Sequence, residues 1–92
     1  NFIKLRWLGI ACEVVEKSEL ENMTNKIVKE LLGVSPLAQR TIKSVLNATQ
    51  NATLHTSIDL EGEAYGRLRS SNDFKEGVKS FSEKRPPSYK GN

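Results

Sequence analysis

Apolar residues recur at helical spacing along most of the chain. In the first long run they lie three or four positions apart, at Leu20, Met23, Ile27 and Leu31. This spacing places them on one face of an α-helix. Ser18 and Glu21 form a capping-box pattern ahead of the run, and Gly33 follows it. The pattern therefore predicts an amphipathic helix that begins at Ser18 and ends at Gly33.

Two more helices are predicted in the middle of the chain. Ser35 and Pro36 are expected to open the first, because serine is a good N-cap and proline fits the first helical position. Asn and Thr residues within 47–53 mark the break between the two. The second covers about residues 54–69, and its apolar face consists of Leu54, Ile58, Tyr65 and Leu68. Glu61 falls on the same face and would need a partner if it were buried.

A last helix is expected to begin at Asp73. Asp73 and Glu76 repeat the capping-box spacing. The apolar face that follows consists of Phe74, Val78 and Phe81. Two consecutive prolines, Pro86 and Pro87, cannot continue a helix. The remaining residues, 88–92, are expected to form a flexible tail.

The first fifteen residues give a weaker pattern. Residues 2–8 are short and apolar and predict the end of a helix, with Gly9 as its C-cap. Residues 10–15 are small or β-branched, which is typical of an extended segment. The fold class is therefore predicted to be all-α: a small bundle of about four helices, with a short extended segment near residues 10–15, in one domain over residues 1–92.

The size and composition fit one small domain. The 92 residues are 37% hydrophobic and 27% charged, with a net charge of +3. A chain of this length buries a modest core, so association with other segments would stabilise it. The chain also begins at Asn1, inside an amphipathic pattern, and we expect it to be a piece of a longer protein.

Residue counts exclude several kinds of chemistry. Cys12 is the only cysteine, so neither an internal disulfide nor a thiolate metal site can form. His55, the only histidine, lies among polar residues without a catalytic motif and is expected to face solvent. The sequence has no apolar run long enough to span a bilayer and no signal-peptide pattern. Neither a metal nor a membrane partner is expected.

Three stretches together resemble a known family. They are WLGIACEVVEKSEL, SPLAQRTIKSVLN and EGEAYGRLRSSNDFKEGVKSFSEKRPP, which span nearly the whole chain in order. They are similar to the C-terminal part of the enoyl-CoA hydratase/isomerase (crotonase) superfamily. The matching positions are Glu61, Tyr65, Leu68, Ser71, Asp73, Glu76, Gly77, Phe81, Glu83, Lys84, Arg85 and Pro87. Residues 10–12 and Ser82 depart from the usual pattern, which leaves the subfamily open.

The resemblance implies an acyl-CoA enzyme whose catalytic groups lie outside the chain. In the family, two backbone N–H groups polarise the thioester carbonyl, and hydratases add water with a pair of glutamates. Both belong to a ββα spiral core that precedes the segment seen here. We therefore expect no catalytic residue in this chain, and Glu61, Glu63 and Glu76 are expected to have capping or surface roles. The full-length protein is expected to be an enoyl-CoA hydratase; the alternative is an isomerase or another reaction of the superfamily.

The resemblance also implies ligand contacts. Coenzyme A enters as part of the substrate, and no prosthetic group is expected. Phe81 is expected to pack on the adenine and Lys84 to bind phosphate, since a spacing of three would place both on one helix face. Tyr65 matches an aromatic position on the acyl side. Without the resemblance, Phe81 and Tyr65 would be core residues, and Lys84 and Arg85 would only complement the helix macrodipole.

Two other functions stay open. One is a basic helical module that binds nucleic acid, although Glu76 and Glu83 interrupt its positive residues. Those residues are Lys75, Lys79, Lys84, Arg85 and Lys90. The other is a pure assembly domain, which would self-associate through Phe2, Trp7, Leu20 and Ile27.

The leading hypothesis specifies partners and a compartment. It implies contacts with the protein's own N-terminal spiral core, with further copies in a trimer or hexamer, and with acyl-CoA, but with no nucleic acid and no membrane. The expected compartment is the cytoplasm, with mitochondria or peroxisomes as the alternative in a eukaryote.

Overall fold

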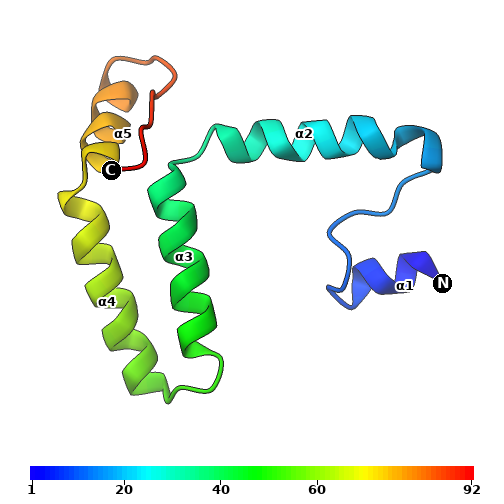
Figure 1. Ribbon diagram of the computed structural model, residues 1–92, viewed down its shortest axis with the longest axis horizontal. Coiled ribbons are helices and arrows are strands. Elements are labelled where there is room, and N and C mark those ends of the chain that lie inside the picture. The colour runs from blue at the N-terminus through cyan, green and yellow to red at the C-terminus, as the bar shows by residue number, and fades with distance from the viewer. The chain divides into compact units, whose positions relative to one another are not determined.

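The computed structural model describes all residues from Asn1 to Asn92 and contains helices but no strand (Figure 1). The elements are α1 (Phe2–Trp7), η1 (a 3-10 helix, Lys17–Glu19), α2 (Leu20–Leu32), α3 (Pro36–Thr49), α4 (Leu54–Ser70) and α5 (Asn72–Ser82). The all-α prediction is confirmed, and the apolar stretch at the N-terminus forms a short helix of its own. The chain divides into two compact units, Asn1–Leu31 and Leu32–Asn92.

The N-terminal unit begins with the short helix α1. The side chain of Asn1 caps it by accepting a hydrogen bond from the backbone N–H of Ile3 at 3.1 Å. Gly9 follows the helix with a φ of +72°, a left-handed conformation that glycine adopts without steric cost. The C-cap itself is Leu8, one residue before the predicted Gly9, and Gly9 takes the left-handed position that commonly follows a helix end. Residues 10–15 have no regular secondary structure, so the segment expected to be extended belongs to no sheet.

The predicted start of α2 is wrong. Lys17–Glu19 form a 3-10 turn that passes directly into α2, so Ser18 lies inside a helical turn and not at its cap. The N-cap position belongs to Glu16, whose backbone is extended at φ −63° and ψ 151°. A capping side chain needs this extended backbone, which Ser18 lacks, and the expected capping box with Glu21 does not form.

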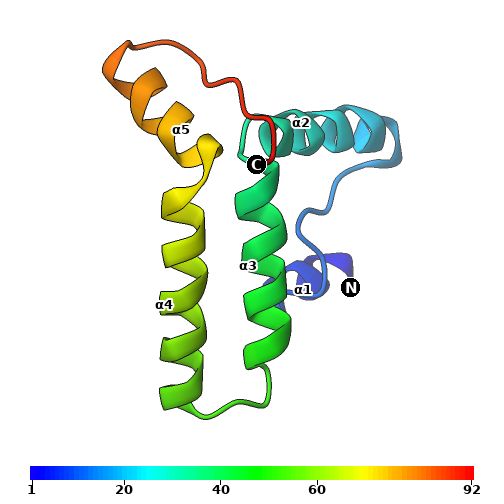
Figure 2. The ribbon, with the colours of Figure 1, turned by 60° about the vertical axis from the view of Figure 1, so that its left-hand side comes forward.

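In the C-terminal unit, α3 and α4 form an antiparallel hairpin (Figures 1 and 2). The predicted start of α3 is confirmed, because the Ser35 hydroxyl accepts a hydrogen bond from the N–H of Ala38 at 3.2 Å and Pro36 is the first helical residue. Thr53 caps α4 in the same way, through the N–H of Thr56 at 3.2 Å. Local capping signals thus fix where both helices of the hairpin begin.

The predicted capping box at the start of α5 is wrong. Ser71, not Asp73, is the N-cap: its hydroxyl accepts a hydrogen bond from the N–H of Phe74 at 3.0 Å and donates one to the carbonyl of Leu68 at 2.6 Å. The backbone of Ser71 is extended, with a ψ of 158°, as a cap requires. Asp73 and Glu76 are left free to bond elsewhere.

The last seven residues, Pro86–Asn92, form a C-terminal strap. The chain reverses after α5 through Lys84, whose φ is +52°, and the strap then returns toward the N-terminal ends of α3 and α5 (Figure 2). There the carbonyl of Asn92 accepts a hydrogen bond from the N–H of Asp73 at 2.9 Å. The expectation of a flexible tail is wrong, because backbone hydrogen bonds fasten the end of the chain.

Few side chains are buried in the chain. Ala64 is the one buried hydrophobic residue, at 4% exposure, while Asp73 and Ser80 are the buried polar ones. Large apolar side chains lie mostly open to solvent, and the most exposed are Phe2, Trp7, Ile10, Leu32, Leu54 and Phe81. Apolar surface of this extent is typical of a face that another polypeptide covers.

We expect the isolated chain to self-associate. Of the four residues predicted to drive this, Phe2, Trp7 and Leu20 are exposed, at 74%, 88% and 59%, whereas Ile27 is partly covered. Sedimentation velocity over a range of concentrations should show species larger than the monomer that grow with concentration. The double variant Phe2→Ser and Trp7→Ser should shift this distribution toward monomer. A single monomeric boundary at the highest concentration would contradict the expectation.

Candidate functional site

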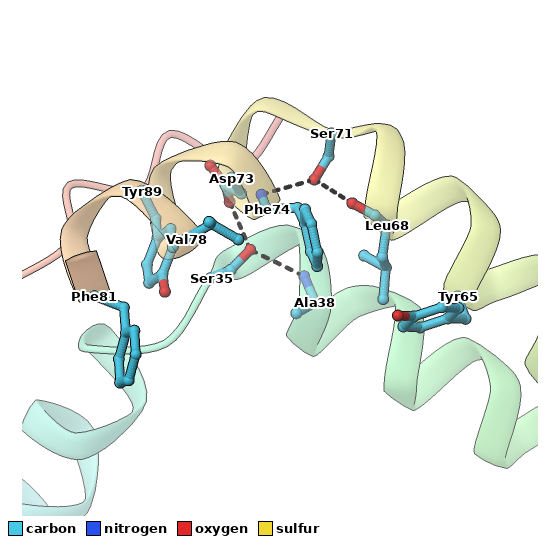
Figure 3. A pocket seen from close by; sticks show the side chains of 11 residues that line it. Ser35, Ala38, Tyr65, Leu68, Ser71, Asp73, Phe74, Val78, Phe81 and Tyr89 are labelled. Carbon is cyan, nitrogen blue, oxygen red and sulfur yellow. Dashed lines mark hydrogen bonds between the residues drawn. The ribbon is translucent and has the colours of Figure 1, made fainter.

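An open apolar groove runs between α3, α4, α5 and the C-terminal strap (Figure 3). It holds about 520 Å³. Its lining residues are Ser35, Ala38, Tyr65, Leu68, Ser71, Asp73, Phe74, Gly77, Val78, Phe81 and Tyr89. The groove therefore lies wholly within the C-terminal unit, and two of the three residues predicted to contact ligand, Tyr65 and Phe81, are among its walls.

Tyr65 and Phe81 reach the groove from different helices. Tyr65 projects from α4 and Phe81 from α5, with Phe74 between them above Ala38 (Figure 3). Phe81 is 88% exposed and Tyr65 58% exposed. The core interpretation is therefore wrong for both residues within this chain. Both aromatic rings remain available to stack on, or pack against, another molecule.

Lys84 lies just beyond α5, and the prediction that it shares a helix face with Phe81 is wrong. Because α5 ends at Ser82 and Lys84 has a φ of +52°, Phe81 and Lys84 do not share a helix face. Lys84 is also absent from the groove lining. Its ammonium group makes no hydrogen bond or ion pair within the chain, so it is available to bind an external anion.

Arg85, in contrast, is paired with two carboxylates of the chain. Its guanidinium group holds the Glu76 carboxylate through two hydrogen bonds, of 2.6 and 3.1 Å, and donates to Glu83 at 2.5 Å. These contacts raise the pKa of Arg85 further and leave its charge neutralised. The ammonium nitrogen of Lys79 lies 4.0 Å from a carboxylate oxygen of Glu83, so Lys79 also has an acidic partner. The hypothesis of nucleic-acid binding thus loses two of the five positive residues on which it depended.

We expect acid to weaken the C-terminal unit through Glu76. Arg85 and the N–H of Ser88 bind its carboxylate and lower its pKa from 4.5 to about 2. Because the pKa is lower in the folded state, the stabilisation is complete above about pH 4.5 and disappears as the pH falls toward about 2. Thermal melts of wild type and Glu76→Gln should show a difference in Tm at neutral pH that shrinks through this window. A constant difference down to pH 2 would contradict the prediction.

The carboxylate of Asp73 joins three parts of the unit. It accepts hydrogen bonds from the Ser35 hydroxyl at 2.5 Å and from the N–H groups of Lys90 at 2.8 Å and Gly91 at 3.1 Å. Burial acts to raise the pKa of Asp73, but these hydrogen bonds outweigh it and lower the pKa below its ordinary value. Sequence reasoning missed this cluster, since the partners of Asp73 lie 17 to 38 residues away from it along the chain.

A second groove, of about 440 Å³, lies along the α3–α4 hairpin. Tyr65 and Leu68 line both grooves, and Glu61 lines only this one. Glu61 is exposed, so the partner that a buried acid would need is not required. No three His, Cys, Asp or Glu side chains gather in a group that could hold a metal ion. None of the helices combines the length and apolar character needed to cross a membrane.

Known proteins show a clear relationship. A family model described as "Enoyl-CoA hydratase/isomerase" matches residues 4–92. The short-chain-enoyl-CoA hydratase of Clostridium acetobutylicum is 32% identical over 78 residues, which are 85% of this chain and 30% of that protein. The trans-2-decenoyl-acyl-carrier-protein isomerase of Streptococcus mutans is 35% identical over 83 residues, which are 90% of this chain and 32% of that protein.

The structural relationship agrees with the sequence relationship. The crystal structure of an enoyl-CoA hydratase from Bacillus anthracis superposes with a TM-score of 0.89 at 30% identity, covering 97% of this chain and 34% of that one. The chain thus spans about a third of the length of the relatives that it matches. Since the family match covers nearly all of its residues, the chain belongs to the enoyl-CoA hydratase/isomerase family, the crotonase superfamily.

Proposed function

We propose that these 92 residues form the C-terminal helical part of an enoyl-CoA hydratase, which adds water to 2-enoyl-CoA thioesters in acyl-CoA metabolism. The family match over residues 4–92 is the observation that carries the proposal. Several relatives at about 30% identity are named hydratases, which supports hydration among the reactions of the superfamily. The catalytic groups then lie on the part of the protein that corresponds to the remaining two thirds of its relatives.

The state of two acids of this chain, Asp73 and Glu76, supports catalytic groups elsewhere in the protein. A general acid or base works best with a pKa near the operating pH. Glu76 has a pKa of about 2 and is held by Arg85, and Asp73 is buried and accepts hydrogen bonds from three groups. Both therefore remain ionised and fixed at neutral pH. Their contacts support architectural roles for both residues, and we infer that proton transfer to or from substrate falls to residues elsewhere.

The exposed groups near α5 fit the ends of a coenzyme A thioester. Phe81 presents an open aromatic ring, which can pack against the adenine. Lys84 carries an unpaired ammonium group three residues further on, which can bind a phosphate as a point charge. Tyr65 lies toward the α3–α4 side of the same groove and would contact the acyl side. This assignment makes Phe81 and Lys84 coenzyme contacts and Tyr65 a substrate contact.

The same proposal accounts for the exposed apolar faces. The spiral core of the same protein and neighbouring copies in a trimer or hexamer would cover them, since apolar surface of this extent is unfavourable in water. The compartment proposed is the cytoplasm, with an organelle as the eukaryotic alternative.

An assay of the full-length protein with two substrates tests the proposed reaction. Crotonyl-CoA reports hydration, because its conjugated double bond absorbs in the ultraviolet and is lost when water adds. A 3-enoyl-CoA reports isomerisation, because the conjugated bond is gained. We expect clear turnover of crotonyl-CoA and little of the 3-enoyl-CoA. The reverse result would replace the hydratase proposal with an isomerase.

A second candidate is an isomerase that acts on an acyl chain held by acyl carrier protein. The observation that favours it is the 35% identity to the Streptococcus mutans protein, whose name states that carrier. The two carriers share a phosphopantetheine arm, but only coenzyme A has the adenine and the 3′-phosphate. Comparing turnover of the same enoyl group on each carrier separates the candidates.

A further inference from the structure

The C-terminal strap makes a set of contacts that the proposed reaction does not require. Its backbone reaches Asp73 three times: Lys90 and Gly91 donate to the carboxylate at 2.8 and 3.1 Å, and the carbonyl of Asn92 accepts from the N–H of Asp73 at 2.9 Å. The guanidinium group of Arg40, on α3, donates to the carbonyl of Gly91 at 2.9 Å. The strap thus ties the start of α5 to α3.

Asp73 is the centre of this arrangement. It is 4% exposed, and its second oxygen accepts the Ser35 hydroxyl at 2.5 Å while that hydroxyl also caps α3. A single carboxylate therefore joins the first turn of α5, the first turn of α3 and the last residues of the chain. Figure 3 shows the bond between Asp73 and Ser35 at the edge of the apolar groove.

A side chain of the strap also forms part of the groove wall. Tyr89 lines the groove together with Val78 and Phe81. Its ring packs directly on the backbone of α5, since a Cβ placed on Gly77 would lie 3.2 Å from the Tyr89 hydroxyl oxygen. Gly77 is therefore the position on α5 that allows Tyr89 to approach.

We propose that the C-terminal strap is a clasp that fixes α5 on α3, with Asp73 as the positioning residue that fastens it and Tyr89 as the side chain that closes one wall of the groove. Unfastening the strap would free α5 to move and would remove Tyr89 from the groove. The clasp itself is independent of the reaction catalysed, whereas its effect on substrate rests on the proposed function.

The first experiment measures hydrogen–deuterium exchange in the full-length protein. Asp73→Asn keeps the size of the side chain but turns one acceptor oxygen into a donor that faces other donors. We expect the amides of Lys90 and Gly91, which bond to Asp73, to exchange at least about tenfold faster, because local opening controls their exchange, while those of α4 stay unchanged. Asp59→Asn, an exposed acid on α4, serves as the matched control. Unchanged exchange of the strap in Asp73→Asn would overturn the clasp.

The second experiment uses a matched pair of glycine substitutions. Gly77→Ala places a methyl group against Tyr89, whereas Gly66→Ala on α4 meets nothing within 4 Å, so only the first should loosen the strap. We expect several-fold faster strap exchange in Gly77→Ala, and its reversal when Tyr89→Phe removes the hydroxyl group. Equal behaviour of the two alanine variants would overturn the contact between Tyr89 and α5.

Substrate kinetics of the same variants test whether Tyr89 forms a wall of the groove. Gly77→Ala should raise KM for an enoyl-CoA several-fold with little change in kcat, and Tyr89→Phe should reverse this. An unchanged KM with a loosened strap would overturn the role of Tyr89 as a groove wall and leave the clasp standing. If wild type turns over no acyl-CoA at all, the proposed function fails, and the exchange data still decide the clasp.

Discussion

The 92-residue chain alone is expected to hydrate no crotonyl-CoA, whereas the full-length protein is expected to hydrate it readily. Acid–base catalysis by each positioned group typically contributes about 10²–10⁴-fold to a rate. Loss of a catalytic pair of acids should therefore lower turnover per chain by at least about 10⁴-fold, below detection in a standard absorbance assay. The measurement is the decrease in crotonyl-CoA absorbance with equal molar amounts of both proteins.

The state of two acids of the chain, Asp73 and Glu76, supports this expectation. Asp73 and Glu76 are ionised and bonded to fixed donors, and neither has a raised pKa suited to donate a proton at neutral pH. The control is the isolated chain carrying Glu76→Gln, which should have the same background rate as the unsubstituted chain. Clear turnover by the isolated chain, with or without Glu76→Gln, would show that its own residues catalyse hydration.

Replacing Lys84 with glutamine in the full-length protein is expected to raise KM for enoyl-CoA by about 10–100-fold and to change kcat little. A hydrogen bond to a charged group contributes about 1.5–3 kcal/mol, which corresponds to this range. Because the phosphates of coenzyme A are distant from the reacting double bond, the bond is made equally in the ground state and the transition state. Glutamine is chosen because its backbone cost at the φ of +52° is similar to that of lysine.

Two controls isolate the phosphate contact. An enoyl-pantetheine thioester lacks the adenine and the phosphates of coenzyme A, so wild type and Lys84→Gln should have the same KM for it. Lys75→Gln replaces another exposed lysine, on α5, and should leave KM for enoyl-CoA unchanged. If Lys84→Gln and Lys75→Gln have the same KM for enoyl-CoA, Lys84 is not a coenzyme contact.

The elements that sequence reasoning placed correctly are those with short-range signals. Ser35 and Pro36 at the start of α3 satisfy backbone N–H groups two or three residues away, so the signal and its effect lie in the same turn. The break between α3 and α4 was likewise visible as a cluster of Asn and Thr. Gly9 indicates the end of α1 because the left-handed backbone that follows the helix depends only on the local residue.

The cap of α5 shows where local signals become ambiguous. Ser71 and Asp73 are both good N-cap residues, and only Asp73 is followed by a glutamate at capping-box spacing. The decision depends on Ser35, Lys90 and Gly91, which draw the Asp73 carboxylate away from its own helix. Groups that are distant in sequence leave no periodic trace, so this cluster could not be predicted.

Phe81 and Lys84 show a different limit. Helical spacing placed both on one face, but the left-handed backbone of Lys84 ends that regularity after Ser82. The apolar pattern of α5 predicted a buried Phe81, and the ring is 88% exposed instead. Periodicity identifies an apolar face but does not show what covers that face. The covering surface can belong to a polypeptide segment outside these 92 residues.

The most direct test is a crystal structure of the full-length protein bound to a saturated acyl-CoA, which lacks the double bond that is hydrated. We predict the adenine in contact with the ring of Phe81 and a phosphate oxygen within about 4 Å of Lys84 Nζ, with the thioester at catalytic groups outside these 92 residues. A bound acyl-CoA that touches neither Phe81 nor Lys84 in any subunit would contradict this prediction.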